Sequence, residues 1–212
     1  MTDFDGLRSR MVETQLKSRG ISDERVLEAM ATVPREAFLP DTGRLDAYED
    51  RPLPIGGGQT ISQPYIVALM AELADIEPGA RVLDVGLGSG YSAAVLAEMG
   101  AEVFAIERRG DLARRAEKTL RRLGYLQVTC RTGDGTLGWP EAAPFDAILV
   151  AAAGAVTQAL REQLKIGGRL IILVPVGAGH QELQRITRRS ETAWDTETIG
   201  GVSFVPLLSG ES

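Results

Sequence analysis

Three side chains in this sequence have types and positions that suit the binding of a nucleoside and chemistry beside it. Glu107 ends the apolar run 102–106, where its carboxylate can accept hydrogen bonds from two ribose hydroxyls. Asp134 lies in a glycine-flanked loop and either accepts a hydrogen bond from an adenine amino group or is a plain turn aspartate. Ser62 precedes Pro64, a residue suited to a helix start, so its hydroxyl either caps that helix or faces a ligand.

A glycine-rich turn must position these side chains. Residues 81–85 read as a strand buried on both faces, and residues 92–99 read as a helix. Between them, glycines 86, 88 and 90 permit a tight turn that brings free backbone N–H groups close to a ligand. A dinucleotide fingerprint needs glycine at the sixth position, where this chain has Tyr91, so a nicotinamide oxidoreductase is disfavoured. The pattern resembles the first motif of S-adenosylmethionine (SAM) methyltransferases. A glycine turn in another α/β protein is the alternative, and Glu107 favours the nucleoside.

The order of elements around this turn predicts a doubly wound, Rossmann-like α/β fold with a mostly parallel sheet. A ligand then lies at the carboxyl ends of the strands, where the strand order reverses. We expect a single domain over 1–212, divided into N-terminal helices and loop (1–60), a SAM-binding core (61–175) and C-terminal strands with a tail (176–212). Beyond the turn, strands are expected at 102–106, 126–131, 145–150 and 169–174, helices at 110–123 and 158–165, and antiparallel edge strands at 184–188 and 202–207.

The N-terminal region predicts two helices and then irregular chain. Ser22 is the expected cap of the second helix, which Pro34 ends. Residues 40–54 resemble a loop, and the three glycines at 56–58 predict that this loop extends to the helix that starts at Pro64.

Composition excludes several classes. A net charge of −6 argues against a nucleic-acid partner, and the arginine pairs at 108–109, 114–115 and 121–122 are interleaved with acids, as in a solvated face. The single cysteine, Cys130, excludes an internal disulfide, and the single histidine, His180, offers no histidine metal cluster, so no metal is expected. No apolar run approaches membrane-spanning length, and the polar start Met1–Asp5 predicts no signal peptide. We therefore expect a cytoplasmic protein that binds neither membranes nor nucleic acids.

Longer motifs carry a more specific resemblance. They include Gln59-Thr60-Ile61-Ser62-Gln63-Pro64-Tyr65, Val33-Pro34-Arg35-Glu36-Ala37-Phe38, Gly88-Ser89-Gly90-Tyr91 and Gly133-Asp134-Gly135. Over nearly its whole length, the chain resembles the protein-L-isoaspartate (D-aspartate) O-methyltransferase family. The resemblance implies SAM-dependent methyl transfer to the α-carboxylate of L-isoaspartyl residues in damaged proteins, which starts repair through a succinimide. S-adenosyl-L-homocysteine is then the second product, and a monomer is expected.

The same resemblance implies site residues. The family's catalytic serine falls on Ser62, which is also expected to contact the acceptor. Cofactor contacts are expected at Thr60, Ile61, Asp84, Gly86, Gly88, Ser89, Gly90, Glu107, Asp134, Gly135 and Gln181. Acceptor contacts are expected at Ile55, Val202, Phe204 and Val205.

Three positions depart from the family pattern: Leu87 and Ala151 each replace a common threonine, and Ser203 replaces a common arginine. They leave open a carboxyl methyltransferase that acts on a different peptide or small-molecule carboxylate. A non-catalytic SAM-binding module is the alternative of another class, against which the intact Thr60-Ile61-Ser62 run argues.

Overall fold

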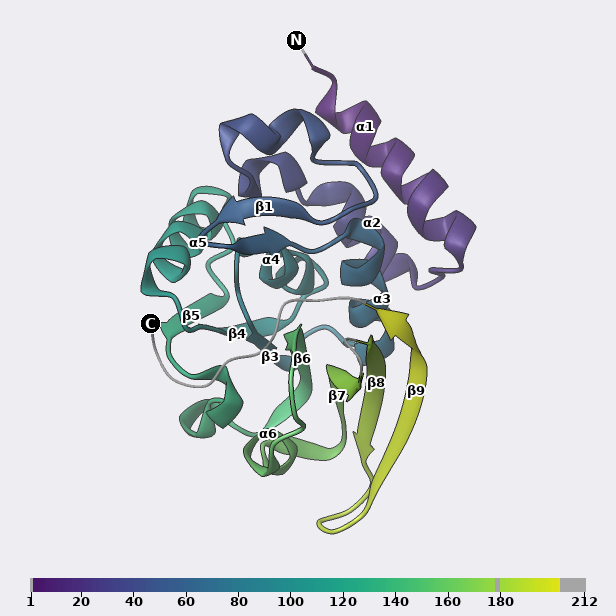
Figure 1. The fold of residues 1–212 in the computed structure, drawn as a ribbon, viewed down its shortest axis with the longest axis vertical. Helices are drawn as coiled ribbons and strands as arrows, with labels where there is room; N and C mark the ends of the chain where they lie inside the picture. The colour runs from purple at the N-terminus through teal and green to yellow at the C-terminus, as the bar shows by residue number, and fades with distance from the viewer. Residues whose placement is uncertain (1, 178–179, 203–212) are drawn as a thin grey trace.

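The centre of the molecule is a seven-stranded sheet in which five neighbouring strands run parallel and the two at one edge run antiparallel. A computed structural model describes residues 2–177 and 180–202. Across the sheet the strand order is β5-β4-β3-β6-β7-β8-β9, and β8 and β9 are antiparallel to their neighbours (Figure 1). The strands are β3 (Arg81–Val85), β4 (Glu102–Glu107), β5 (Val128–Thr132), β6 (Phe145–Ala153), β7 (Leu164–Gly177), β8 (His180–Arg188) and β9 (Trp194–Val202). The order reverses between β3 and β6, as the predicted doubly wound fold requires.

Helices cover both faces of this sheet. They are α1 (Phe4–Met11), α2 (Glu24–Thr32), α3 (Pro64–Ala74), α4 (Tyr91–Glu98), α5 (Gly110–Arg122) and α6 (Gln158–Glu162). Alternate residues of β3 enter different apolar clusters: Val82 packs with α2 to α5, and Leu83 packs with Leu160 of α6 on the other face. Both faces of the parallel strands are therefore buried, which explains their continuous apolar sequences.

A β-hairpin replaces the loop that the three glycines predicted. Strands β1 (Leu53–Gly56) and β2 (Gln59–Ile61) pair antiparallel. Gly57 and Gly58 form the turn with φ of 61° and 73°, a left-handed conformation that suits a two-residue hairpin turn. The prediction failed because glycine clusters mark loops and tight hairpins alike. The hairpin lies beyond the ends toward which β6 and β7 point, so β2 leads the chain over this edge of the sheet (Figure 1).

The N-terminal helices begin and end differently from the prediction. After α1 the chain continues through a π-turn, η1 (Val12–Leu16), and a 3₁₀ turn, η2 (Lys17–Arg19), before Gly20 ends it in the left-handed conformation. Asp23, not Ser22, caps α2, because its carboxylate accepts the Arg25 backbone N–H at 2.9 Å. Residues 40–54 include a 3₁₀ turn at 41–46 and the start of β1 rather than loop alone. The remaining 3₁₀ turns are η3 (Arg35–Phe38), η4 (Asp41–Asp46), η5 (Gly135–Leu137) and η6 (Pro140–Ala142).

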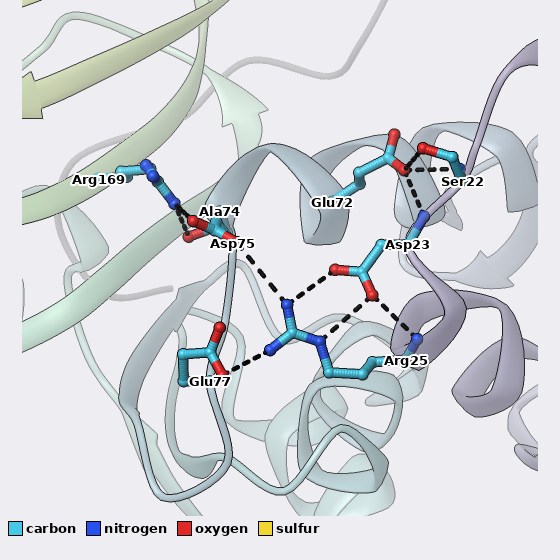
Figure 2. A network of polar contacts seen from close by, with 8 residues as sticks. All are labelled: Ser22, Asp23, Arg25, Glu72, Ala74, Asp75, Glu77 and Arg169. Carbon is cyan, nitrogen blue, oxygen red and sulfur yellow. Dashed lines mark hydrogen bonds and ion pairs between the residues drawn. The ribbon is translucent and has the colours of Figure 1, made fainter.

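A polar network joins α2 to the end of α3 and to β7 (Figure 2). The Glu72 carboxylate accepts the backbone N–H groups of Ser22 and Asp23 at 2.7 and 2.8 Å. The Arg25 guanidinium bonds Asp23 and forms an ion pair with Glu77 at 2.8 Å. Ser22 therefore donates its backbone N–H to Glu72 instead of capping α2, which fixes α2 against α3.

Other boundaries also differ from the prediction. Strand β5 starts at Val128 rather than at residue 126, and β6 continues through the three alanines to Ala153. The helix expected at 158–165 ends at Glu162, and β7 runs from Leu164 straight through its glycine pair. A strand that was not predicted, β9, occupies 194–202, and the edge strand expected at 202–207 falls on residues 203–207, which lie outside the described residues. In the part of the chain that the structure describes, no helix is long and apolar enough to cross a membrane.

Candidate active site

A cavity of about 260 Å³ opens at the carboxyl ends of β3, β4 and β6, at the point where the strand order reverses. The glycine turn and the segment 59–62 from the hairpin form two of its walls. The expected site residues that line it are Thr60, Ile61, Ser62, Gly86, Gly88, Ser89, Glu107 and Gly135. Four separate stretches of the sequence, at 60–62, 86–89, 107 and 135, thus meet around one space, as the prediction for a switch-point site required.

Backbone conformation explains the glycines of the turn. Gly86, Gly88 and Gly90 have φ of 93°, 53° and 90°, a region in which side chains are strained. Close approach explains Gly135, since a Cβ atom there would lie 2.4 Å from Cγ1 of Val85. These positions bring backbone to the edge of the cavity without side chains that would fill it.

Glu107 is buried at the end of β4, and the backbone orients its carboxylate. Oε2 accepts the Gly88 N–H at 2.9 Å, and Oε1 accepts the Arg109 N–H at 3.0 Å. Each carboxylate oxygen has two lone pairs, so both oxygens retain the capacity to accept another hydrogen bond. This arrangement suits two adjacent hydroxyl groups such as those of a ribose.

Asp84 is a second buried acid, in β3 immediately before the turn. Its side chain is 0% exposed, and neither carboxylate oxygen finds a hydrogen-bond partner among the described residues. Burial, and then the nearby charge of Glu107, raise the pKa of Asp84 to about 7. A buried acid without a partner is costly in its charged form, which is why burial shifts it toward the protonated form.

Ser62 lies between β2 and α3 and lines the cavity. It does not cap α3, because the capping position is Gln63 and the helix has no side-chain cap hydrogen bond. The capping alternative for Ser62 is therefore wrong. Its backbone carbonyl accepts a hydrogen bond from Nη2 of Arg35 at 2.7 Å, which attaches Ser62 to the N-terminal region.

Other expected site residues lie elsewhere. Asp134 caps η5, since its Oδ1 accepts the N–H and hydroxyl of Thr136 at 2.9 and 2.7 Å, as a turn aspartate does. Ile55, Asp84, Gly90 and Asp134 do not line the cavity, although a Cβ atom on Gly88 would lie 3.6 Å from Ile55. Gln181 lines a different hollow between β8 and β9, and Val202 ends β9. The expected contacts Phe204 and Val205, together with Ser203, lie outside the described residues.

The structure adds two arginines that the sequence interpretation placed on a solvated face. Arg108 and Arg109 both line the cavity, directly after Glu107. The Arg109 guanidinium lies against the hairpin turn, since a Cβ atom on Gly57 would meet it at 2.9 Å. The sequence did offer a signal for this placement, since both arginines directly follow the acid at the end of the strand. Farther along α5, Arg115 and Arg121 pair with acids four residues away, as predicted.

The switch-point cavity, its glycine turn and the acid that ends the next strand define a Rossmann-like SAM-dependent methyltransferase. A family model described as protein-L-isoaspartate(D-aspartate) O-methyltransferase matches residues 7–212. The chain belongs to this family.

Relatives and solved structures agree with this assignment. The chain is 58% identical over 210 residues to a protein-L-isoaspartate O-methyltransferase 2 of Marinobacter nauticus, which covers 99% of this chain and 96% of that protein. It is 60% identical over 208 residues to a protein-L-isoaspartate O-methyltransferase of Methylorubrum populi, with 97% of each chain covered. A solved protein-L-isoaspartate O-methyltransferase superposes with a TM-score of 0.86 at 30% identity, over 94% of this chain and 65% of that longer one. A Plasmodium falciparum structure of the same family, bound to S-adenosyl-L-homocysteine, has a TM-score of 0.82 at 28% identity, over 95% of this chain and 98% of that one.

Proposed function

We propose that SAM and an acceptor carboxylate meet in the cavity between the glycine turn and the segment 59–62, where Ser62 orients the carboxylate. One observation carries the proposal: the same cavity is lined by Gly86, Gly88 and Glu107 on one side and by Ser62 on the other. A cofactor held by the turn would therefore lie beside the serine hydroxyl.

The protein is a SAM-dependent protein-L-isoaspartate O-methyltransferase, the activity of its family. The acceptor is the α-carboxylate of an L-isoaspartyl residue in a damaged protein. Its methyl ester is more reactive than the carboxylate, so the following backbone amide displaces methanol and closes a succinimide. Hydrolysis of the succinimide returns part of the damaged residue to normal aspartate.

The cofactor roles follow from the donor set. Glu107 would accept hydrogen bonds from the ribose hydroxyls, with its two oxygens oriented by the Gly88 and Arg109 backbone. Gly86, Gly88 and Gly135 would allow the backbone to approach the nucleoside. Asp84 is buried behind the turn and does not line the cavity, so its charge would offset the positive charge of SAM through space rather than by contact.

The chemistry needs orientation more than acid or base catalysis. Bound SAM would supply a methyl group attached to a sulfonium sulfur. An acceptor oxygen bonds to the methyl carbon as the carbon–sulfur bond breaks. A carboxylate with a pKa of about 4 is already ionised at neutral pH, so no general base is required. The protein's contribution is to align the oxygen with the methyl carbon and to exclude water. A hydrogen bond from the Ser62 hydroxyl would hold the acceptor in that line.

Replacement of the serine tests this assignment. We expect Ser62→Ala to lower kcat for a short isoaspartyl peptide by roughly 10- to 1000-fold, the range for loss of a positioning contact. The affinity for SAM should stay within about twofold, because the glycine turn is unchanged. Ser18→Ala is the control, since Ser18 is exposed and bonds only a backbone carbonyl in η1. Full activity of Ser62→Ala would remove Ser62 from the mechanism.

The family departures bear on which acceptor is used. Leu87 and Ala151 both line the cavity, so two of the three departures face the reaction space. Transfer of labelled methyl from SAM should reach an isoaspartyl peptide and not its aspartyl twin. Transfer to neither peptide, with SAM still bound, would favour a carboxyl methyltransferase for another acceptor.

We further propose that residues 1–212 act as one methyltransferase domain and as a cytoplasmic monomer without a nucleic-acid partner. One apolar cluster supports the first point, since it joins Leu16 and Met30 to Val82 and Leu183. The net charge of −6 supports the absence of nucleic acid. Sedimentation at equilibrium would test the monomer, and a dimer mass would contradict it.

A further inference from the structure

Arg35 is a completely buried arginine beside the proposed catalytic serine. Its side chain is 0% exposed and extends from η3 into the space between the N-terminal region and the core. Nε donates to the Ala47 carbonyl and Nη2 donates to the Ser62 carbonyl, both at 2.7 Å. The guanidinium carbon also lies 4.9 Å from the ring centroid of Tyr91, which lines the cavity.

The bonding of Arg35 is unusual for a buried cation, since both acceptors are backbone carbonyls rather than carboxylates. Nη1 finds no hydrogen-bond partner among the described residues. A buried charge with neutral partners is unfavourable for stability, and apolar replacements of similar volume are often neutral or stabilising. The arginine therefore serves the arrangement of these two carbonyls more than the stability of the fold.

The position of the Ser62 carbonyl decides where its hydroxyl points. Residue 62 lies outside both β2 and α3, so it belongs to neither the strand ladder nor the helix, and the bond from Arg35 holds its carbonyl. The planar guanidinium connects Ser62 to Ala47 in a fixed geometry, with Tyr91 below it. Tyr91 is itself fixed by an edge-on contact with Phe38, at 5.7 Å between ring centroids.

We propose that Arg35 is a positioning residue for methyl transfer, which acts through Ser62 by holding its backbone carbonyl in place. This inference rests on the proposed role of Ser62. It adds a requirement for the N-terminal region in catalysis, although that region precedes the SAM-binding core in the sequence.

Arg35→Lys tests the proposal, because it retains the charge and loses the planar group that bonds two carbonyls at once. We expect kcat for an isoaspartyl peptide to fall roughly 10-fold and the KM for SAM to stay within about twofold, since misplacement of a reacting group mainly affects the chemical step. The same substitution in the Ser62→Ala background should change kcat by less than about twofold, because the hydroxyl that it positions is gone.

Arg188→Lys is the matched control. Arg188 also donates to backbone carbonyls, those of Leu164, Glu162 and Ser190, and lies over the Trp194 ring at 5.3 Å. It lies beside the start of β7, at the end of the parallel strands opposite the cavity. Arg188→Lys should lower the melting temperature without an effect on kcat.

The outcomes separate this inference from the function on which it rests. If Ser62→Ala is fully active, the role of Ser62 fails and the inference fails with it. If Ser62→Ala is impaired and Arg35→Lys lowers kcat equally in both backgrounds, only the inference is overturned. An Arg35→Lys protein with wild-type kcat, or without a cooperative melting transition, would also overturn it, the latter because the arginine would then be a stability element.

Discussion

Removal of the Asp84 charge should make the ligand-free enzyme more stable at high pH. Asp84 is fully buried, its oxygens have no partner among the described residues, and its pKa is raised from 3.8 to about 7 by burial and then by Glu107. In the unfolded chain the same carboxyl loses its proton near pH 4. Between pH 4 and 7 the folded state therefore binds more protons than the unfolded state, so this group lowers stability as the pH rises.

The size of the effect follows from the two pKa values. Each unit of difference corresponds to about 1.4 kcal/mol, so the loss is about 4 kcal/mol over the whole interval and roughly 3 kcal/mol between pH 5 and pH 8. Asp84→Asn cannot ionise and lacks this loss. Its stability relative to the wild type should rise by roughly 3 kcal/mol from pH 5 to pH 8, or about 6–12 °C in Tm for a chain of this size.

Thermal and urea unfolding of the ligand-free proteins at both pH values would measure this difference. Asp146→Asn is the control with the opposite sign. Burial acts to raise the pKa of Asp146, but hydrogen bonds from Lys165 and from the Arg81 backbone outweigh it and hold the pKa below its ordinary value. The wild-type advantage over Asp146→Asn should therefore stay nearly constant from pH 5 to pH 8 and shrink only as the pH falls below about 4. A stability difference between Asp84→Asn and the wild type that is constant from pH 5 to 8 would refute the reasoning. In a separate measurement, saturating SAM should stabilise Asp84→Asn less than the wild type.

Two other changes test the cavity wall and the attachment of α2. Gly135→Ala should weaken SAM binding several-fold and lower stability by about 1–3 kcal/mol, because its Cβ atom would lie 2.4 Å from Val85. Titration calorimetry would show this, and Gly200→Ala, where a Cβ atom meets nothing within 4 Å, should bind SAM normally. Glu72→Ala should lower the free energy of unfolding by about 1–2 kcal/mol, since it removes the acceptor for the Ser22 and Asp23 N–H groups (Figure 2). Urea unfolding would measure it, and a changed KM for SAM in Glu72→Ala would contradict a purely structural role.

Local chemistry explains what the sequence could predict. The turn at 86–90 and the helix ended by Gly100 follow from short stretches in which glycine conformation and apolar runs agree. Glu107 was predictable because its carboxylate is positioned by a strand end and by the turn 19 residues earlier. The parallel sheet followed from the alternation of strands with helices.

Predictions failed where distant groups decide the structure. Ser22 and Asp23 are both good capping residues, and Glu72, about 50 residues away, takes the backbone of the first. Strand β7 resumes after Gly167 and Gly168 because β6 pairs with Leu164 before them and both β6 and β8 pair with Arg169 after them, with a register shift against β6 across the glycines. This pairing on either side overrides the local tendency of glycine to end an element. The role of Arg35 could not be predicted, although it lies in a motif shared with the family, since a buried arginine that bonds carbonyls 12 and 27 residues away has no pattern in spacing.

The shared core of the N-terminal helices and the later helices α3 and α4 has a consequence for synthesis. Leu16, Met30 and Val33 are fully buried, and Tyr91 donates to the Met30 sulfur at 3.5 Å. These apolar side chains leave the ribosome before the helices that cover them, and about 5–20 residues are added per second. The apolar surface of the first 60 residues therefore stays uncovered for the few seconds in which α3 and α4 are synthesised, and a chaperone can bind it during that time. The segment that carries Arg35 is thus made before the helices that enclose it.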